Sequence, residues 1–300
     1  MGLIKVAEIS IDKLEDRKTV TAILHENGYT VGPGKRKKTE TGKQLDYYLK
    51  VYVEEGTDKA ELYKATSGKT KVTAKKVTDA ELTELVFILD RSGSMGGLES
   101  DTIGGFNGMI ERQKKEGEKV NVTTILFDDE VEIIHDRFPI DAVQPLTDKE
   151  YYVRGCTALL DAVGQAINKI DNVQKHLPEE HRAGKVLFVI TTDGLENSST
   201  EFNYNDIKRM IEAKKECGWE FLFLGANIDA GKEAEKIGIE RNRSVTYEND
   251  HDGVALNYEA VGRAVRGVTK SRACSVKLDD TWASDIAEYH DKAGKGRWTV

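Results

Sequence analysis

The sequence predicts an α/β protein in which a doubly wound, mostly parallel sheet is flanked by helices and preceded by a small α+β domain. Short, continuous apolar runs span residues 85–89, 186–190 and 221–224, and such runs are typical of strands buried on both faces of a parallel sheet. Segments with apolar residues at helical spacing separate most of these runs, and this alternation predicts right-handed crossovers. The length of 300 residues allows two domains.

The elements of the larger domain are predicted in order from their apolar spacing. A helix over residues 98–116 follows the first strand, and the strand at 120–127 returns at 131–135, which predicts an antiparallel edge hairpin. The acidic residues 128–130 between them lack the spaced ligands and the loop glycine of an EF-hand, so they are interpreted as a plain turn. The remaining predictions are helix 158–175, a strand that ends before Asp193, helix 204–217, strand 220–227, helix 230–237, strand 244–247 and helix 254–268.

Composition divides the chain into unlike parts. Residues 1–80 contain 16 Lys and Arg against 12 Asp and Glu, a net charge of +4, whereas residues 81–300 carry −12. This asymmetry suggests two units with different surfaces. The predicted boundaries are 1–55 for a small α+β domain of unknown role, 56–82 for a linker, 83–275 for the α/β domain and 276–300 for a C-terminal extension of uncertain order.

The small domain is predicted to be a β-α-β-β unit. Strands are expected over residues 3–11, from Tyr29 and over residues 45–53, with a helix over 14–27 that stops at an Asn-Gly pair. The stretch Gly32–Lys43 contains glycines, a proline and a basic run, and is predicted to form a hairpin tip.

The basic run in that tip consists of Lys35, Arg36, Lys37 and Lys38, and two interpretations of it are open. Beside the tyrosines of residues 47–52, it would act as a nucleic-acid tether. Alternatively, its charges keep a β edge soluble. The short run and the charge of only +4 favour the second interpretation.

Composition also excludes several classes of protein. Charged residues make up 32% of the chain and hydrophobic residues 39%, as in soluble globular proteins. No apolar run approaches the roughly 20 residues that span a bilayer, and the first residues do not resemble an export signal. The three cysteines are widely spaced, which argues against a disulfide framework and fits a reducing compartment. We therefore expect a cytoplasmic location.

Three oxygen-bearing side chains follow the first apolar run of the larger domain. Asp90 comes directly after residues 85–89, and Ser92 and Ser94 lie on a tight turn that Gly93 permits. In open α/β sheets, ligands bind at the carboxyl ends of the strands. A carboxylate with hydroxyls and water suits Mg²⁺ or Mn²⁺ rather than zinc. A single carboxylate leaves such a metal under-neutralised, so it can accept an acidic group from a partner.

The pattern Asp-x-Ser-x-Ser at residues 90–94 resembles the metal-ion-dependent adhesion site (MIDAS) of von Willebrand factor A (vWA) domains. That family's site also contains a threonine on a later loop and an aspartate after a later strand. Gly155-Cys156-Thr157 resembles the threonine loop, and residues 186–194 resemble the strand end, with Asp193 as ligand. The resemblance covers about residues 82–275 and implies the vWA, Rossmann-like fold. Thr157 also precedes a predicted helix, so an N-cap role is the alternative.

The resemblance implies a metal-dependent protein-binding module and not an enzyme. In this interpretation Mg²⁺ or Mn²⁺ is held by five side chains and completed by a Glu or Asp of a partner protein. The expected cytoplasmic location resembles that of bacterial or phage intracellular members, which work with AAA-type ATPases or stress-response assemblies. The implied ligands are Asp90, Ser92, Ser94, Thr157 and Asp193, the last directly or through water.

A metal-assisted phosphohydrolase is the alternative from another class. Haloacid-dehalogenase-type phosphatases also place an aspartate at the end of a first strand. They need a second aspartate two residues later as acid and base, and this chain has Ser92 there. The sequence also shows no candidate general base beside the implied ligands and no nucleophile–histidine pairing.

Overall fold

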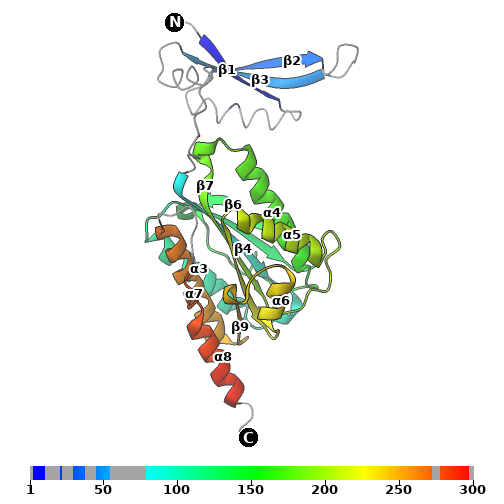
Figure 1. Ribbon diagram of the computed structural model, residues 1–300, viewed down its shortest axis with the longest axis vertical. Coiled ribbons are helices and arrows are strands. Elements are labelled where there is room, and N and C mark those ends of the chain that lie inside the picture. The colour runs from blue at the N-terminus through cyan, green and yellow to red at the C-terminus, as the bar shows by residue number, and fades with distance from the viewer. Residues whose placement is uncertain are drawn as a thin grey trace. The chain divides into compact units, whose positions relative to one another are not determined.

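The computed structural model describes residues 3–10, 21, 30–37, 45–54, 79–271 and 278–296. The chain forms two compact units, Met1–Ala74 and Lys75–Val300 (Figure 1). The smaller unit contains a three-stranded sheet and the larger unit a six-stranded sheet.

The smaller unit is built on an antiparallel sheet with strand order β1-β3-β2. Leu49 and Val51 are 4% and 2% exposed and alternate with half-buried neighbours, so one face of β3 carries a core. The helix predicted over 14–27 lies outside the described residues, except for Thr21, which is helical. The strands are β1 Leu3–Ser10, β2 Thr30–Lys37 and β3 Leu45–Glu54.

The predicted start of the hairpin tip at Gly32 is wrong, because β2 continues to Lys37. Lys35, Arg36 and Lys37 are paired with residues 45–47 of β3 and belong to the sheet. The basic run is therefore not a free loop over these three positions.

The reason for this error lies in the role of Gly34. A β-carbon at Gly34 would lie 2.5 Å from the ring of Tyr48, so the glycine permits a close approach of the tyrosine across the sheet and does not mark a turn. Lys35 is exposed, and Lys38 lies outside the described residues. A nucleic-acid contact at the basic run stays a prediction.

The larger unit is a doubly wound α/β domain, which confirms the predicted fold class. Its strand order is β6-β5-β4-β7-β8-β9, with parallel pairing except between β5 and β6. The chain leaves central β4 for β5 on one side and later returns to β7 on the other, so the loops after β4 and β7 meet at a switch point. The strands are β4 Asp79–Asp90, β5 Val120–Phe127, β6 Val131–Pro139, β7 Ala183–Thr192, β8 Trp219–Ala226 and β9 Ser244–Tyr247.

Helices cover both faces of this sheet. Leu85, Phe87 and Leu89 of β4 pack into a core that includes residues of α3, α7 and α8, whereas Val86 and Ile88 pack into a core with α4, α5 and α6. Figure 1 shows these two groups of helices on opposite sides of the sheet. Burial on both faces explains why the strand reads as a continuous apolar run. The helices are α3 Glu99–Lys114, α4 Leu159–His176, α5 Tyr204–Glu216, α6 Ala230–Lys236, α7 His251–Lys270 and α8 Ser284–Gly296.

Two segments differ from their predictions. β4 begins at Asp79, inside the predicted linker 56–82, so the strand starts before the apolar run that marks it in the sequence. The predicted extension 276–300 contributes to the core of the larger unit, where Leu278, Trp282 and Ile286 are buried. The Trp282 indole also donates a 2.9 Å hydrogen bond to the carbonyl of Asn242.

The described cysteines Cys156 and Cys217 are free and exposed, and Cys274 lies outside the described residues. Over the described ranges, no helix combines the length and the apolar character that crossing a membrane requires.

Candidate metal centre

Asp90 lies at the carboxyl end of the central strand β4 and is 1% exposed. Its Oδ1 accepts a 2.7 Å hydrogen bond from the Ser92 amide, and its Oδ2 accepts a 2.6 Å hydrogen bond from the Thr192 hydroxyl. Burial raises the pKa of Asp90 to about 6, although these hydrogen bonds oppose the shift. A cation at this carboxylate would compensate the charge that burial disfavours.

Ser92 precedes a short 3-10 turn at Gly93–Met95, which contains Ser94 and which buried Met95 anchors. The Ser92 and Ser94 hydroxyl oxygens are 3.2 Å apart, and Ser94 donates a 2.5 Å hydrogen bond to Oδ1 of Asp193. The serine turn is therefore joined to the loop that follows β7. Ser94 is exposed, so this side of the site faces the surface.

Asp193 follows β7, the parallel neighbour of β4, and is 2% exposed. Its Oδ2 accepts a 3.4 Å hydrogen bond from the Asn249 side chain. Burial raises the pKa of Asp193 above its usual value, and the hydrogen bonds from Ser94 and Asn249 oppose this shift. Asp90 and Asp193 are thus two buried carboxylates at the ends of adjacent strands.

Thr157 is 3% exposed and its hydroxyl lies beside the same loop. A β-carbon placed on Gly194 would be 3.4 Å from the Thr157 hydroxyl oxygen and 3.5 Å from that of Ser94. Gly194 therefore leaves a space that both hydroxyls border. The Thr157 backbone is held by Asn197, which accepts from its amide at 2.9 Å and donates to its carbonyl at 3.1 Å.

The N-cap alternative for Thr157 does not describe how α4 begins. The N-cap residue is Ala158, and the amides of the second and third residues of the helix are bound by side chains from the loop after β7. Glu196 accepts from the amide of Leu160 at 2.9 Å, and Ser199 accepts from that of Asp161 at 3.0 Å. The Thr157 hydroxyl is therefore not needed to satisfy the helix.

The predicted ligands come from three loops and meet at one end of the sheet. Ser94 is hydrogen-bonded to Asp193, and the Ser92 amide is hydrogen-bonded to Asp90. The hydroxyl oxygens of Thr157 and Ser94 both lie within 3.5 Å of the position that a β-carbon on Gly194 would take. Two carboxylates and three hydroxyls form an all-oxygen donor set that fits a hard divalent cation. In the part of the chain that the structure describes, no group of three or more His, Cys, Asp and Glu side chains could hold a metal, so this site depends on its hydroxyls.

Sequence reasoning missed several residues that shape the site. Thr192 binds the Asp90 carboxylate, and its position beside Asp193 was the available signal. The Tyr151 hydroxyl donates a 2.6 Å hydrogen bond to the carbonyl of Asp90, and Asn249 binds Asp193. No sequence motif marks Tyr151 or Asn249, because both are distant from their partners in the sequence and meet them only in the folded chain.

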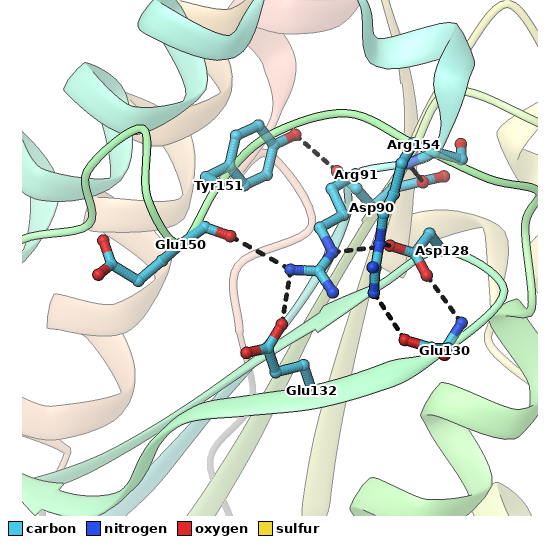
Figure 2. A network of polar contacts seen from close by, with 9 residues as sticks. Asp90, Arg91, Asp128, Glu130, Glu132, Glu150, Tyr151 and Arg154 are labelled. Carbon is cyan, nitrogen blue, oxygen red and sulfur yellow. Dashed lines mark hydrogen bonds and ion pairs between the residues drawn. The ribbon is translucent and has the colours of Figure 1, made fainter.

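A buried ion-pair cluster lies next to the site, where Asp128 was predicted to be part of a plain turn. Arg91 and Asp128 are both 0% exposed, and Arg91 Nε donates to Asp128 Oδ2 at 2.8 Å (Figure 2). Arg154 Nε donates to the same oxygen at 2.7 Å. Burial raises the pKa of Asp128, but the hydrogen bonds from Arg154, from the Glu130 amide and from Arg91 outweigh burial and hold it below its usual value.

No protein-family model matches the sequence, and a search of curated proteins found no match. Among solved structures, the chain is similar to the vWF domain of the type V pili tip protein Mfa5 from Porphyromonas gingivalis, with 12% identity and a TM-score of 0.47 over 69% of this chain and 100% of that one. It is also similar to proximal thread matrix protein 1 from the mussel byssus with a zinc-occupied MIDAS motif, with 16% identity and a TM-score of 0.41 over 63% of this chain. This match covers 47% of the mussel protein, so the chain spans about half of its length.

A third similar structure is the manganese-loaded TRAP protein of Plasmodium vivax, with 14% identity and a TM-score of 0.39 over 60% of this chain and 73% of that one. The metals named for these structures are those of the mussel and Plasmodium proteins. The doubly wound architecture of this chain follows from its own strand order.

Proposed function

We propose that the larger unit is a metal-dependent protein-binding module. Mg²⁺ or Mn²⁺ would be held by Asp90, Ser92, Ser94 and Thr157, with Asp193 bound directly or through water. The observation that carries this proposal is the meeting of two buried carboxylates, at the ends of β4 and β7, with three hydroxyls from the turn after β4 and the loop before α4. Such an oxygen set matches the preference of these ions.

The sixth position of the metal is proposed to take a Glu or Asp from a partner protein. Octahedral coordination leaves a position open after the protein's own ligands, and the turn that carries exposed Ser94 borders the surface there. The metal would then act as an electrostatic bridge between two carboxylate-bearing chains. AAA-type ATPases and stress-response assemblies remain the proposed classes of partner, on the resemblance of residues 90–94, 157 and 193 alone.

A binding role accounts for the residue at position 92 better than a phosphohydrolase role does. The phosphatase mechanism needs a carboxyl group there to exchange a proton with the leaving group. Ser92 instead places a hydroxyl 3.2 Å from that of Ser94, another proposed ligand of the metal. We therefore propose that the metal binds a partner and that the module is not an enzyme.

Replacing Thr157 by Ala tests the ligand set. We expect the Mg²⁺ dissociation constant to rise about tenfold or more, as for other losses around metal sites, while the melting temperature of the metal-free protein changes little. The stability should persist because Glu196 and Ser199 bind the amides of Leu160 and Asp161 in the first turn of α4. Isothermal titration calorimetry and thermal melts measure both quantities.

Thr200→Ala is the matched control for this experiment, since it removes an exposed hydroxyl from the loop that follows β7. It should leave the dissociation constant unchanged. A Thr157→Ala protein that melts earlier and binds Mg²⁺ as the wild type does would instead support the helix-cap interpretation.

A further inference from the structure

The loop of residues 150–158, which carries Thr157, is fastened to the ends of β4 and β5 by its backbone. The amide of Arg154 donates to the carbonyl of Arg91 at 3.0 Å, and the amide of Ala158 donates to that of Asp128 at 2.7 Å. The carbonyl of Gly155 accepts from the amide of Gly93 at 3.3 Å. The position of the loop therefore depends on residues that directly follow Asp90 and Phe127.

The ion-pair cluster of Arg91, Asp128 and Arg154 reinforces this attachment with charge. Figure 2 shows both guanidinium groups converging on the Asp128 carboxylate, one from the loop after β4 and one from the 150–158 loop. Because both bonds reach the same Oδ2 atom at 2.8 and 2.7 Å, Asp128 joins the serine turn to the threonine loop through the end of β5. Charge-assisted hydrogen bonds of this kind are short and directional.

The two guanidinium groups are themselves fixed by further contacts. Arg91 Nη1 lies 2.7 Å from a carboxylate oxygen of Glu132 and donates to the carbonyl of Glu150 at 3.2 Å. The Tyr152 ring lies 5.3 Å from the Arg91 guanidinium carbon and 5.6 Å from that of Arg154. These contacts restrict the rotation of both side chains, so the cluster acts as a rigid connector.

We infer that this cluster sets the position of the Thr157 hydroxyl relative to Asp90, and that Arg154 is a positioning residue for the metal. The inference rests on the proposed function, since it concerns the same site. Arg154 is three residues before Thr157 and binds a carboxylate that also holds the residue after Asp90. Its side chain therefore couples two groups of ligands that come from different loops.

The sign of the effect on metal affinity separates positioning from simple electrostatics. Removing a positive charge near a cation site favours the cation, so charge alone predicts tighter Mg²⁺ binding for Arg154→Gln. Positioning predicts weaker binding, by about tenfold, as for other residues that orient metal ligands. Arg154→Lys keeps the charge but loses the fork geometry, so positioning predicts weaker binding for this variant as well.

The experiment measures the Mg²⁺ dissociation constant of the full chain by calorimetry for the wild type and for both Arg154 variants. Arg154 is 39% exposed, so we expect both variants to fold, and circular dichroism melts verify this. Lys149→Gln is the matched control, because it removes an exposed positive charge just before the same loop. This control should leave the dissociation constant unchanged or lower it slightly.

A second comparison shows whether Arg154 acts through Thr157. If it does, Arg154→Gln should weaken Mg²⁺ binding in the wild-type background and have no further effect in the Thr157→Ala background. Unchanged or tighter binding by Arg154→Gln, or equal weakening in both backgrounds, would overturn the inference alone. A wild type that does not bind Mg²⁺ would overturn the proposed function and this inference together.

Discussion

Replacing Asp90 by Asn should abolish Mg²⁺ binding and at the same time stabilise the metal-free protein at pH 7.5. The substitution removes the carboxylate that anchors the proposed site. It also removes a buried charge, since Asp90 is 1% exposed and burial raises its pKa from 3.8 to about 6. This shift corresponds to a gain of up to about 3 kcal/mol in the free energy of unfolding, and urea titration in the presence of a chelator measures it.

The gain in the free energy of unfolding of Asp90→Asn should increase with pH. The folded protein binds the Asp90 proton more tightly than the unfolded chain, because the folded pKa of about 6 exceeds the ordinary 3.8. Below the unfolded pKa of 3.8, the Asp90 carboxyl is protonated in both states and does not lower the stability of the wild type. As the pH rises through the folded pKa of about 6, the wild type loses stability because the buried carboxyl ionises. The difference between Asp90→Asn and wild type should be largest above pH 6 and should close toward pH 4.

Asp161→Asn is the matched control, since Asp161 is also buried but its carboxylate has many donors. Its oxygens accept from the amides of residues 200–202 at 2.8 to 2.9 Å. Weakening these bonds should lower the free energy of unfolding by about 1–3 kcal/mol, the opposite sign. If Asp90→Asn also destabilised the metal-free protein, the Asp90 carboxylate would stabilise the fold, and its buried charge would not be a cost of the proposed metal site.

Replacing Arg91 by Met should destabilise the larger unit by about 3 kcal/mol or more, because breaking a buried ion pair leaves the charge of the remaining partner less compensated. Arg91 and Asp128 are both 0% exposed. Among the described residues, the carboxylate of Asp128 would keep Arg154 and one backbone amide as partners. Urea unfolding followed by circular dichroism measures the loss.

Arg241→Met serves as the control, because Arg241 pairs with Glu235 at the surface and their side chains are 58% and 51% exposed. A loss below about 1 kcal/mol is expected for such a pair. Adding Asp128→Asn to Arg91→Met should recover part of the stability, since the buried charge is then gone. Equal losses for Arg91→Met and Arg241→Met would contradict the importance of burial for the cluster.

The sequence predicts the buried strands of the larger unit, and it marks the proposed ligands at the strand ends, for a physical reason. A strand buried on both faces must be apolar along its whole length, so residues 85–89 stand out, and Asp90 is marked as the first polar residue beyond them. Asp193 is the first carboxylate after the apolar run of β7, and two threonines separate it from that run. Because neighbouring parallel strands end at the same edge of the sheet, the proximity of Asp90 and Asp193 follows from the fold class.

The supporting residues could not be predicted because they depend on contacts that are distant in sequence. Asp128 has the sequence environment of an ordinary turn, and only its approach to Arg91, 37 residues earlier, makes it a buried ion-pair partner. Glu196 binds an α4 amide 36 residues earlier in the chain and leaves no local pattern. In the smaller unit, Gly34 resembled a turn signal because a glycine beneath a tyrosine ring looks the same in sequence.

Affinity capture from a lysate of the source cells tests the central claim most directly. Three baits are compared: the wild type with Mg²⁺, the wild type with a chelator, and Asp90→Asn with Mg²⁺. Because Asp90→Asn is expected to be at least as stable as the wild type, any loss of capture cannot come from unfolding. The account predicts a protein retained by the first bait alone and released when its contacting Glu or Asp is replaced. The same proteins on all three baits would contradict a metal-bridged interaction.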